Sequence, residues 1–177
     1  MKLNKLIAIA TISLLSGGIS MAQKALNLED IVAGNIIQTK GIGSMTWLKD
    51  GERYSRLENN KQTGGTDIVA YRAKDNSREV IIPSSLLTDK STGRPIPVRS
   101  VSWSADNEKI LIYNNTRRVW RYDTRGDYWV LNLKDGALRQ LGKGMPESSM
   151  MFAKFSPDGT RVAYVSNNNI YVEDVAS

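Results

Sequence analysis

The chain has 177 residues, carries a net charge of +6 at pH 7 and contains neither histidine nor cysteine. The lack of histidine removes the commonest general base, the ordinary Ser-His-Asp triad and the commonest metal ligand, and no phosphate loop, dinucleotide turn or Gly-x-Ser-x-Gly elbow is present. We therefore predict no catalytic residue, no cofactor and no metal site in this chain, and no nucleic-acid binding, because the basic excess is small and scattered.

Residues 1–22 have the pattern of a secretory signal. A short basic start precedes a mostly apolar stretch over residues 6–15, and residues 20–22, Ser-Met-Ala, place small side chains at the two positions that a signal peptidase inspects. The apolar stretch is shorter than the ~20 residues that a membrane span needs. We predict cleavage before Gln23, export to the periplasm or cell envelope, and no membrane attachment afterwards; a retained anchor is the alternative.

Residues 23–38 are predicted to form a helical lead-in. Leu28 and Ile31 are spaced for one side of a short helix, and Gly34 is placed to end it. We expect one or two helical turns with a structural role.

From residue 39 to residue 177 the sequence changes to short runs rich in aromatic and β-branched residues, separated by tight turns. Trp47, Trp103 and Phe155 recur at intervals of 56 and 52 residues, and each precedes an Asp-Gly or Asp-Asn turn. Up to four short strands fit in each interval, and periods of about 40 to 50 residues with four strands indicate propeller blades. The predicted fold is therefore all-β, an incomplete β-propeller of about three blades.

A β-sandwich is the alternative for this much alternating sequence, but it has no internal copies. Propellers close with four to eight blades, and each blade covers its apolar face only by stacking on its neighbours. We therefore expect additional chain or another subunit to cover the two terminal blades.

Two segments depart from the rhythm of the blades. Residues 82–97, rich in proline and serine, are predicted to be a loop between the first and second blades. Residues 114–124 are predicted to interrupt the second blade between its second and third strands. Four arginines lie in or beside this second segment, namely Arg117, Arg118, Arg121 and Arg125, and four aromatic residues could stack on them, namely Trp120, Tyr122, Tyr128 and Trp129.

The arginines of this segment have two interpretations. A guanidinium held by an aromatic ring can donate several hydrogen bonds in a fixed fork to a peptide carbonyl or carboxylate. The alternative is that the arginines pair with Asp123 and Asp127 and only tie down the segment.

The runs TRRVWRYDTRGDYWVLNL, residues 116–133, and FAKFSPDGTRVAYVSNNNIYVEDVAS, residues 152–177, closely resemble the N-terminal propeller of dipeptidyl peptidase IV, of the prolyl oligopeptidase family of serine peptidases. The resemblance suggests a truncated bacterial member. It implies an eight-bladed propeller followed by an α/β-hydrolase domain, which is missing here, in an enzyme that removes dipeptides with proline or alanine second from peptide N-termini. It also allows a homodimer of the full enzyme.

The resemblance also implies one substrate-binding residue. The pair Trp120-Arg121 matches the family's arginine that contacts a backbone carbonyl of the bound dipeptide, so Arg121 is the candidate. The family's paired glutamates and its serine, acid and histidine have no counterpart in this sequence. The expected function is thus the N-terminal propeller fragment of an exported dipeptidyl peptidase, with a peptide substrate as partner; the alternative is a non-enzymatic periplasmic propeller interaction module.

Overall fold

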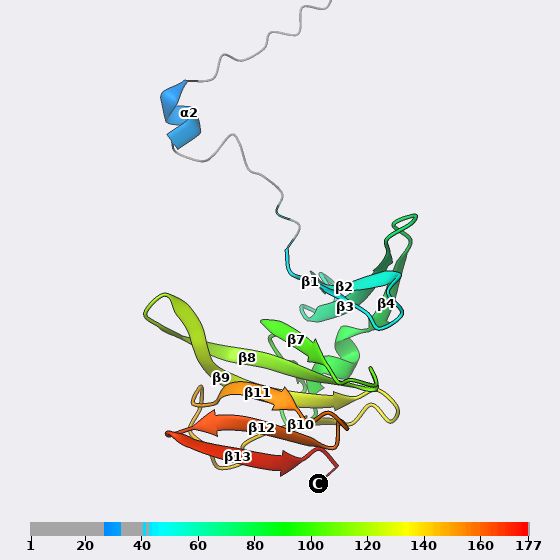
Figure 1. Cartoon of the computed structure of the whole chain (residues 1–177). Helices are drawn as coiled ribbons and strands as arrows, with labels where there is room; N and C mark the ends of the chain where they lie inside the picture. The colour runs from blue at the N-terminus through cyan, green and yellow to red at the C-terminus, as the bar shows by residue number, and fades with distance from the viewer. Residues whose placement is uncertain (1–26, 33–40, 42, 177) are drawn as a thin grey trace, which may run out of the picture. The chain divides into compact units, whose positions relative to one another are not determined.

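The computed structural model describes residues 27–32, 41 and 43–176 (Figure 1). The predicted signal, residues 1–22, lies outside the described residues, as does most of the predicted lead-in. The chain divides into two units, Met1–Gly41 and Ile42–Ser177. In the first unit the helix α2 (Leu28–Val32) is described, and none of the described helices is long and apolar enough to cross a membrane.

The second unit confirms the all-β prediction, because its strands form successive antiparallel sheets (Figure 1). The first sheet has the order β1-β2-β3-β4, with β1 (Met45–Trp47), β2 (Arg53–Asn59), β3 (Thr66–Arg72) and β4 (Arg78–Ile82). The second has the order β10-β9-β8-β7, with β7 (Ser100–Trp103), β8 (Lys109–Val119), β9 (Tyr122–Asn132) and β10 (Leu138–Gln140). The third has the order β11-β12-β13, with β11 (Met151–Phe155), β12 (Arg161–Ser166) and β13 (Asn169–Asp174).

The repeated aromatic residues occupy equivalent places in the three sheets. Trp47, Trp103 and Phe155 are each the last residue of the first strand of their sheet. Each also pairs with the second strand close to the point where that strand begins. The sequence repeat is therefore a structural repeat of one sheet, as in a propeller blade.

The turn after the aromatic residue is built in the same way in the second and third sheets. The Ser104 hydroxyl oxygen accepts the Lys109 amide at 3.0 Å, and the Ser156 hydroxyl oxygen accepts the Arg161 amide at 3.0 Å. Each serine donates in turn to the aspartate two residues later. In the third sheet the Ser156 hydroxyl, with the amide and hydroxyl of Thr160, lowers the pKa of Asp158 to about 2. The carboxylate is thus an integral hydrogen-bond acceptor of the turn.

Successive sheets share apolar cores, as stacked blades do. Ile110, Ile112 and Leu131 of the second sheet pack with Ile68 and Ile82 of the first, and all five are 0% exposed. The next core belongs to the opposite side of the second sheet: it joins Leu111, Tyr128 and Val130 to Val162 and Tyr164 of the third sheet. Ile110, Leu111 and Ile112 thus alternate between two cores, as the period of two in a strand requires.

The connection over residues 82–97 is more ordered than the predicted loop, which corrects that prediction. It contains a 3-10 helix η1 (Ser84–Leu87) and a small hairpin of β5 (Thr88–Asp89) and β6 (Arg94–Pro95). Its side chains Leu87 and Ile96 are buried in the core between the first two sheets. The connection therefore supplies part of the packing between the blades.

Both outer sheets expose apolar side chains on the face that has no stacked neighbour. In the first sheet Trp47 is 59% exposed, beside the stacked rings of Tyr54 and Tyr71. In the third sheet Ile170 and Val172 are 77% and 57% exposed. These are the faces that adjacent blades cover in a propeller, so the expectation of an incomplete propeller agrees with the structure.

Candidate functional site

The second and third strands of the second sheet, β8 and β9, continue beyond the sheet as a two-stranded arm, here residues 115–125 (Figure 1). The predicted insert, residues 114–124, lies between the second and third strands of the sheet as expected. It is a continuation of both strands, which pair with each other as far as Val119 and Tyr122. The strand turns at Trp120, whose φ is 63°. The sequence of the arm is polar and lacks the alternation of apolar and polar residues that predicts a strand. The two strands of the arm are therefore held together by their backbone pairing.

The base of the arm is fixed by Tyr113 and Gly126. The Tyr113 hydroxyl lies 3.1 Å from the Asp123 carbonyl oxygen and 2.9 Å from that of Arg125, so it can donate to either one. Burial raises the pKa of Tyr113 to about 12, which keeps this donor protonated at neutral pH. A β-carbon at Gly126 would lie 2.4 Å from the Tyr113 ring and 2.6 Å from the Asn114 carbonyl oxygen. Only glycine leaves the tyrosine room to hold the arm.

A second set of contacts ties the arm to the connection before the third sheet. The buried Asp127 carboxylate accepts the Asn115 amide group at 2.7 Å and the Ser148 backbone amide at 2.8 Å. The Ser148 hydroxyl donates to the Asn115 carbonyl oxygen at 2.6 Å. The arm therefore begins from a base that is braced on two sides.

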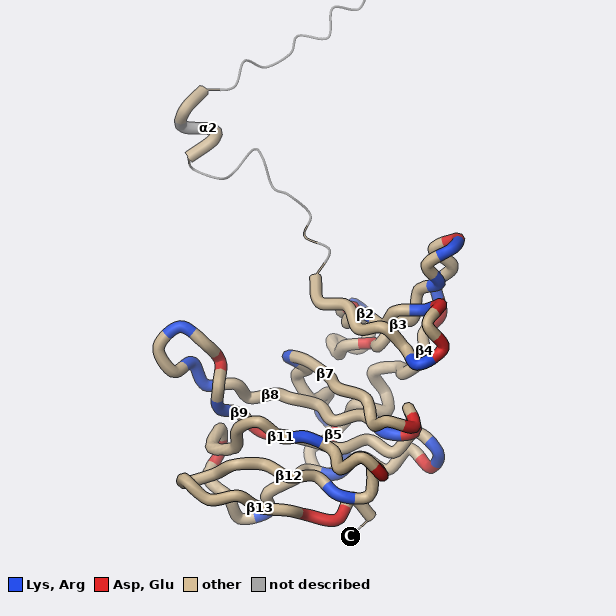
Figure 2. Tube along the Cα trace, in the orientation of Figure 1, with Lys and Arg blue, Asp and Glu red and all other residues tan. Residues whose placement is uncertain are grey.

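The arginines of the arm form no ion pairs with the described carboxylates. Asp123 pairs with Arg99 of the neighbouring strand region at 3.2 Å, while Asp127 is occupied by Asn115 and Ser148. Within the described part of the chain, no carboxylate lies within 4.0 Å of any guanidinium in the arm. The interpretation that these arginines pair with Asp123 and Asp127 is thus wrong for the described residues, and Figure 2 shows the basic segments along the arm.

The four aromatic residues in or beside the arm do not stack on its arginines, so the expectation that aromatic rings hold the guanidinium groups is wrong. Tyr128 stacks on Tyr113 instead, with ring centroids 4.8 Å apart, and Trp129 packs against the core between the first two sheets. Trp120 and Tyr122 are 94% and 72% exposed at the arm's turn. The orientation of the arm therefore comes from its base.

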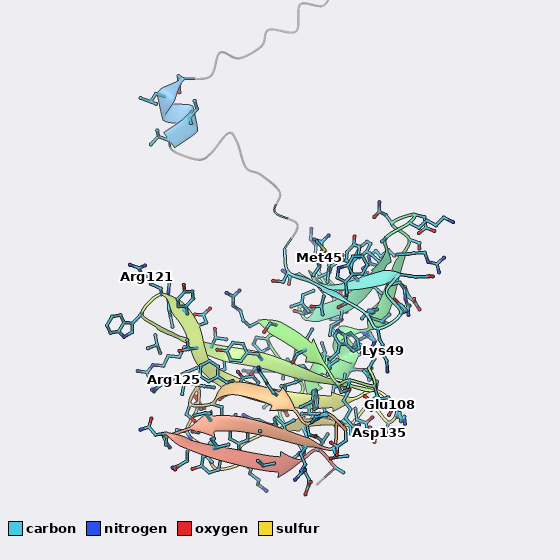
Figure 3. All side chains as sticks on the ribbon, viewed as in Figure 1. Met45, Lys49, Glu108, Arg121, Arg125 and Asp135 are labelled. Carbon is cyan, nitrogen blue, oxygen red and sulfur yellow. The ribbon has the colours of Figure 1, made fainter. Side chains whose placement is uncertain are left out.

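A recess of about 500 Å³ lies between the arm and the neighbouring strands. Its lining consists of Ser44, Arg99, Ser100, Tyr113, Arg118, Arg121, Tyr122 and Asp123. Arg118 donates from Nη2 to the Arg121 carbonyl oxygen at 3.3 Å, which closes the turn that carries Arg121. The candidate Arg121 thus lies at the exposed end of the arm and lines this recess, and Figure 3 labels it there, away from Arg125.

The sequence reasoning missed Arg99, Tyr113 and Gly126. A glycine inside a strand pattern signals a close approach of another group, so Gly126 could have been found. Arg99 could not, because the pairing with Asp123 joins residues that are 24 positions apart. Among the described residues, no group of three or more acidic side chains could hold a metal ion.

Comparison with known proteins extends these observations. Residues 104–177 match the family model of the dipeptidyl peptidase IV N-terminal region. These residues of the chain are thus similar to a dipeptidyl peptidase IV N-terminal region. The prediction of this resemblance is confirmed, and the matched residues include the whole arm, all of the third sheet and most of the second.

The relatives that this chain matches are much longer proteins. A probable dipeptidyl-aminopeptidase B of Aspergillus terreus is 25% identical over 171 residues, covering 92% of this chain and 18% of that protein. Dipeptidyl aminopeptidase B of Saccharomyces cerevisiae is 27% identical over 157 residues, covering 83% of this chain and 17% of that protein. The chain thus spans less than a fifth of the length of these relatives.

A solved structure shares the fold. Dipeptidyl peptidase 4 of Porphyromonas gingivalis superposes with a TM-score of 0.67 at 21% identity, and the match covers 87% of this chain and 21% of that one. The stacked sheets described above are therefore blades of a β-propeller.

Proposed function

We propose that this chain forms the opening blades of the propeller of an exported serine dipeptidyl peptidase, an enzyme that removes Xaa-Pro or Xaa-Ala dipeptides from peptide N-termini. The chain would admit and bind the peptide, and an α/β-hydrolase domain would carry out the hydrolysis. The matched dipeptidyl peptidase IV region and the relatives named as dipeptidyl aminopeptidases support this proposal. The signal pattern of residues 1–22 supports export to the periplasm or cell envelope.

The peptide-binding role rests on one observation, that the Arg121 side chain is exposed and has no ion-pair partner among the described residues. Its guanidinium is exposed at the end of a braced arm, and none of the described carboxylates lies within ion-pair distance of it. A guanidinium has five N–H donors and no acceptor, so it can hold a substrate carbonyl oxygen without needing a proton transfer. We assign this contact to Arg121.

The base of the arm makes such a contact useful for catalysis. Tyr113 and Gly126 fix the direction in which the arm leaves the sheet, and Asp127 braces its first residue. A donor whose position is set before the peptide binds loses less conformational freedom on binding. Holding the peptide's carbonyl in one place would present the scissile bond to a nucleophile in a reactive geometry.

The chain's part in the reaction is limited to binding. It contains no histidine, so a histidine general base must come from outside these 177 residues. What the propeller would supply is orientation of the peptide and exclusion of folded proteins. A homodimer of the full enzyme is compatible with this role.

Photo-crosslinking tests whether the arm touches peptides. A peptide beginning Ala-Pro with a benzophenone amino acid at its third position is irradiated with the protein, and the attached residues are mapped by mass spectrometry. We expect attachment within residues 117–125, because the arm's turn and recess offer unpaired donors there. The exposed β5–β6 hairpin, which also carries an arginine, is the internal control. Attachment at that hairpin as often as at the arm would contradict the proposal.

A further inference from the structure

The recess beside the arm has more hydrogen-bond donors than acceptors. Three of its lining side chains are guanidinium groups, and its one carboxylate, Asp123, already pairs with Arg99 at 3.2 Å. Arg118 and Arg121 remain without a carboxylate partner among the described residues. The lining thus carries two positive charges in excess of the acidic one, so it attracts an anionic group.

The groups that are still available in the recess select the kind of anion. Arg118 uses one N–H on the Arg121 carbonyl oxygen, at 3.3 Å, and a guanidinium has further donors to offer. Its planar fork matches the two oxygens of a carboxylate. The hydroxyls of Ser44 and Ser100 lie in the same lining and can complete the set of donors.

The shape of the recess fits a side chain that belongs to a longer ligand. The recess has a volume of about 500 Å³, and its lining includes the rings of Tyr113 and Tyr122, which can contact the methylene groups of a glutamate. Arg121 lines the same recess, so a peptide whose carbonyl is held by Arg121 would place a nearby side chain beside Arg118. One bound peptide could therefore contact Arg121 through a backbone carbonyl and Arg118 through an acidic side chain.

We propose that this recess binds an acidic side chain of the peptide and that Arg118 is the residue that determines this preference. The inference rests on the proposed function in one respect, that the ligand is a peptide. It adds a selectivity for glutamate or aspartate over their neutral amides, which is set by the arm. Arg118 is a specificity residue in this account and takes no part in bond breaking.

The test compares two peptides that differ in one group. The first, Ala-Pro-Glu-Glu-Ala with a fluorescent label at its C-terminus, is matched by Ala-Pro-Gln-Gln-Ala. Binding to the whole protein that carries this chain is followed by stopped-flow fluorescence anisotropy, before any cleavage. We expect the glutamate peptide to bind about fivefold more tightly in 50 mM salt, because partly exposed ion pairs contribute modestly. The preference should shrink in 500 mM salt, since screening weakens exposed charge pairs.

Two variants locate the preference. Arg118→Gln should bind both peptides equally, whereas Arg117→Gln, which removes an exposed charge on the same strand outside the recess, should keep most of the preference. Equal binding of the two peptides by the unaltered protein would overturn the inference and leave the proposed function standing. A preference that survives Arg118→Gln would overturn it as well, because the selectivity would lie elsewhere. Failure to bind either peptide would overturn both proposals.

Discussion

Replacing Leu131 by alanine is expected to lower the free energy of unfolding by about 2–5 kcal/mol, the usual cost of a large-to-small change in a packed core. Leu131 lies in the central strand β9, is 0% exposed, and packs in the core that joins the first two sheets. Its neighbours across the sheet are Ile110 on β8 and Leu138 on β10, so the surrounding structure has little freedom to collapse into the cavity. Urea denaturation of the unaltered and altered proteins measures the difference.

Leu86→Ala provides the matched control, because it removes the same atoms from a side chain that is 37% exposed. Its effect should stay within about 1 kcal/mol, since substitutions away from the core change stability little. If Leu131→Ala cost no more than Leu86→Ala, the first two sheets would not share a stabilising core, and the stacking of blades described above would be wrong.

Arg121→Ala is expected to lower kcat/KM of the proposed peptidase on an Xaa-Pro substrate by about 1.5–3 kcal/mol of transition-state stabilisation, or about 10- to 150-fold. The physical reason is the loss of a charge-assisted hydrogen bond to the substrate carbonyl. None of the described carboxylates pairs with Arg121, so replacing this side chain should leave the fold intact. Steady-state kinetics with a chromogenic Xaa-Pro substrate gives the ratio, and the thermal unfolding midpoint checks that stability is unchanged.

Arg125→Ala is the control for this change. It removes the same charge from the same arm, but Arg125 does not line the recess and lies apart from Arg121 in Figure 3. We expect less than about a threefold change in kcat/KM for Arg125→Ala, because only the general field of the arm is altered. Equal losses in the two variants would show that net charge matters and that Arg121 has no specific contact.

The propeller repeat could be predicted from the sequence because its signals are local. The Ser-x-Asp turn is formed by hydrogen bonds between residues two to five positions apart, so the residue types alone report it. In the first sheet Leu48 takes the serine position and the Asp50 carboxylate caps the turn through the amides of Glu52 and Arg53. That substitution is why the repeat is less regular there.

The connection between the first two blades was mispredicted for a different reason. Proline and serine are frequent in this connection and indicate a loop, but the burial of Leu87 and Ile96 depends on sheets that lie far away in the sequence. The structure of such a segment depends on tertiary packing, which cannot be predicted from its local composition. The same holds for the arm, whose polar residues conceal a strand that is held by backbone pairing.

The candidate site was only partly visible in the sequence. Arg121 followed from the resemblance, but its surroundings did not, because the recess joins residues from before β1 and β7 with residues of β8 and β9. Arg99 pairs with Asp123, so this carboxylate is already occupied and does not pair with the arginines of the arm. A contact of this kind depends on the register of neighbouring strands, and that register is fixed only when the sheet is formed.

The proposed dipeptidyl peptidase activity is tested most directly by identifying what the whole protein that carries this chain releases from a peptide. Ala-Pro followed by a short neutral sequence is incubated with the protein, and the products are identified by mass spectrometry, with the N-acetylated peptide as control. We expect release of the dipeptide Ala-Pro from the free peptide and no cleavage of the acetylated one. Cleavage within both peptides, or cleavage of neither, would contradict the assignment to a dipeptidyl peptidase.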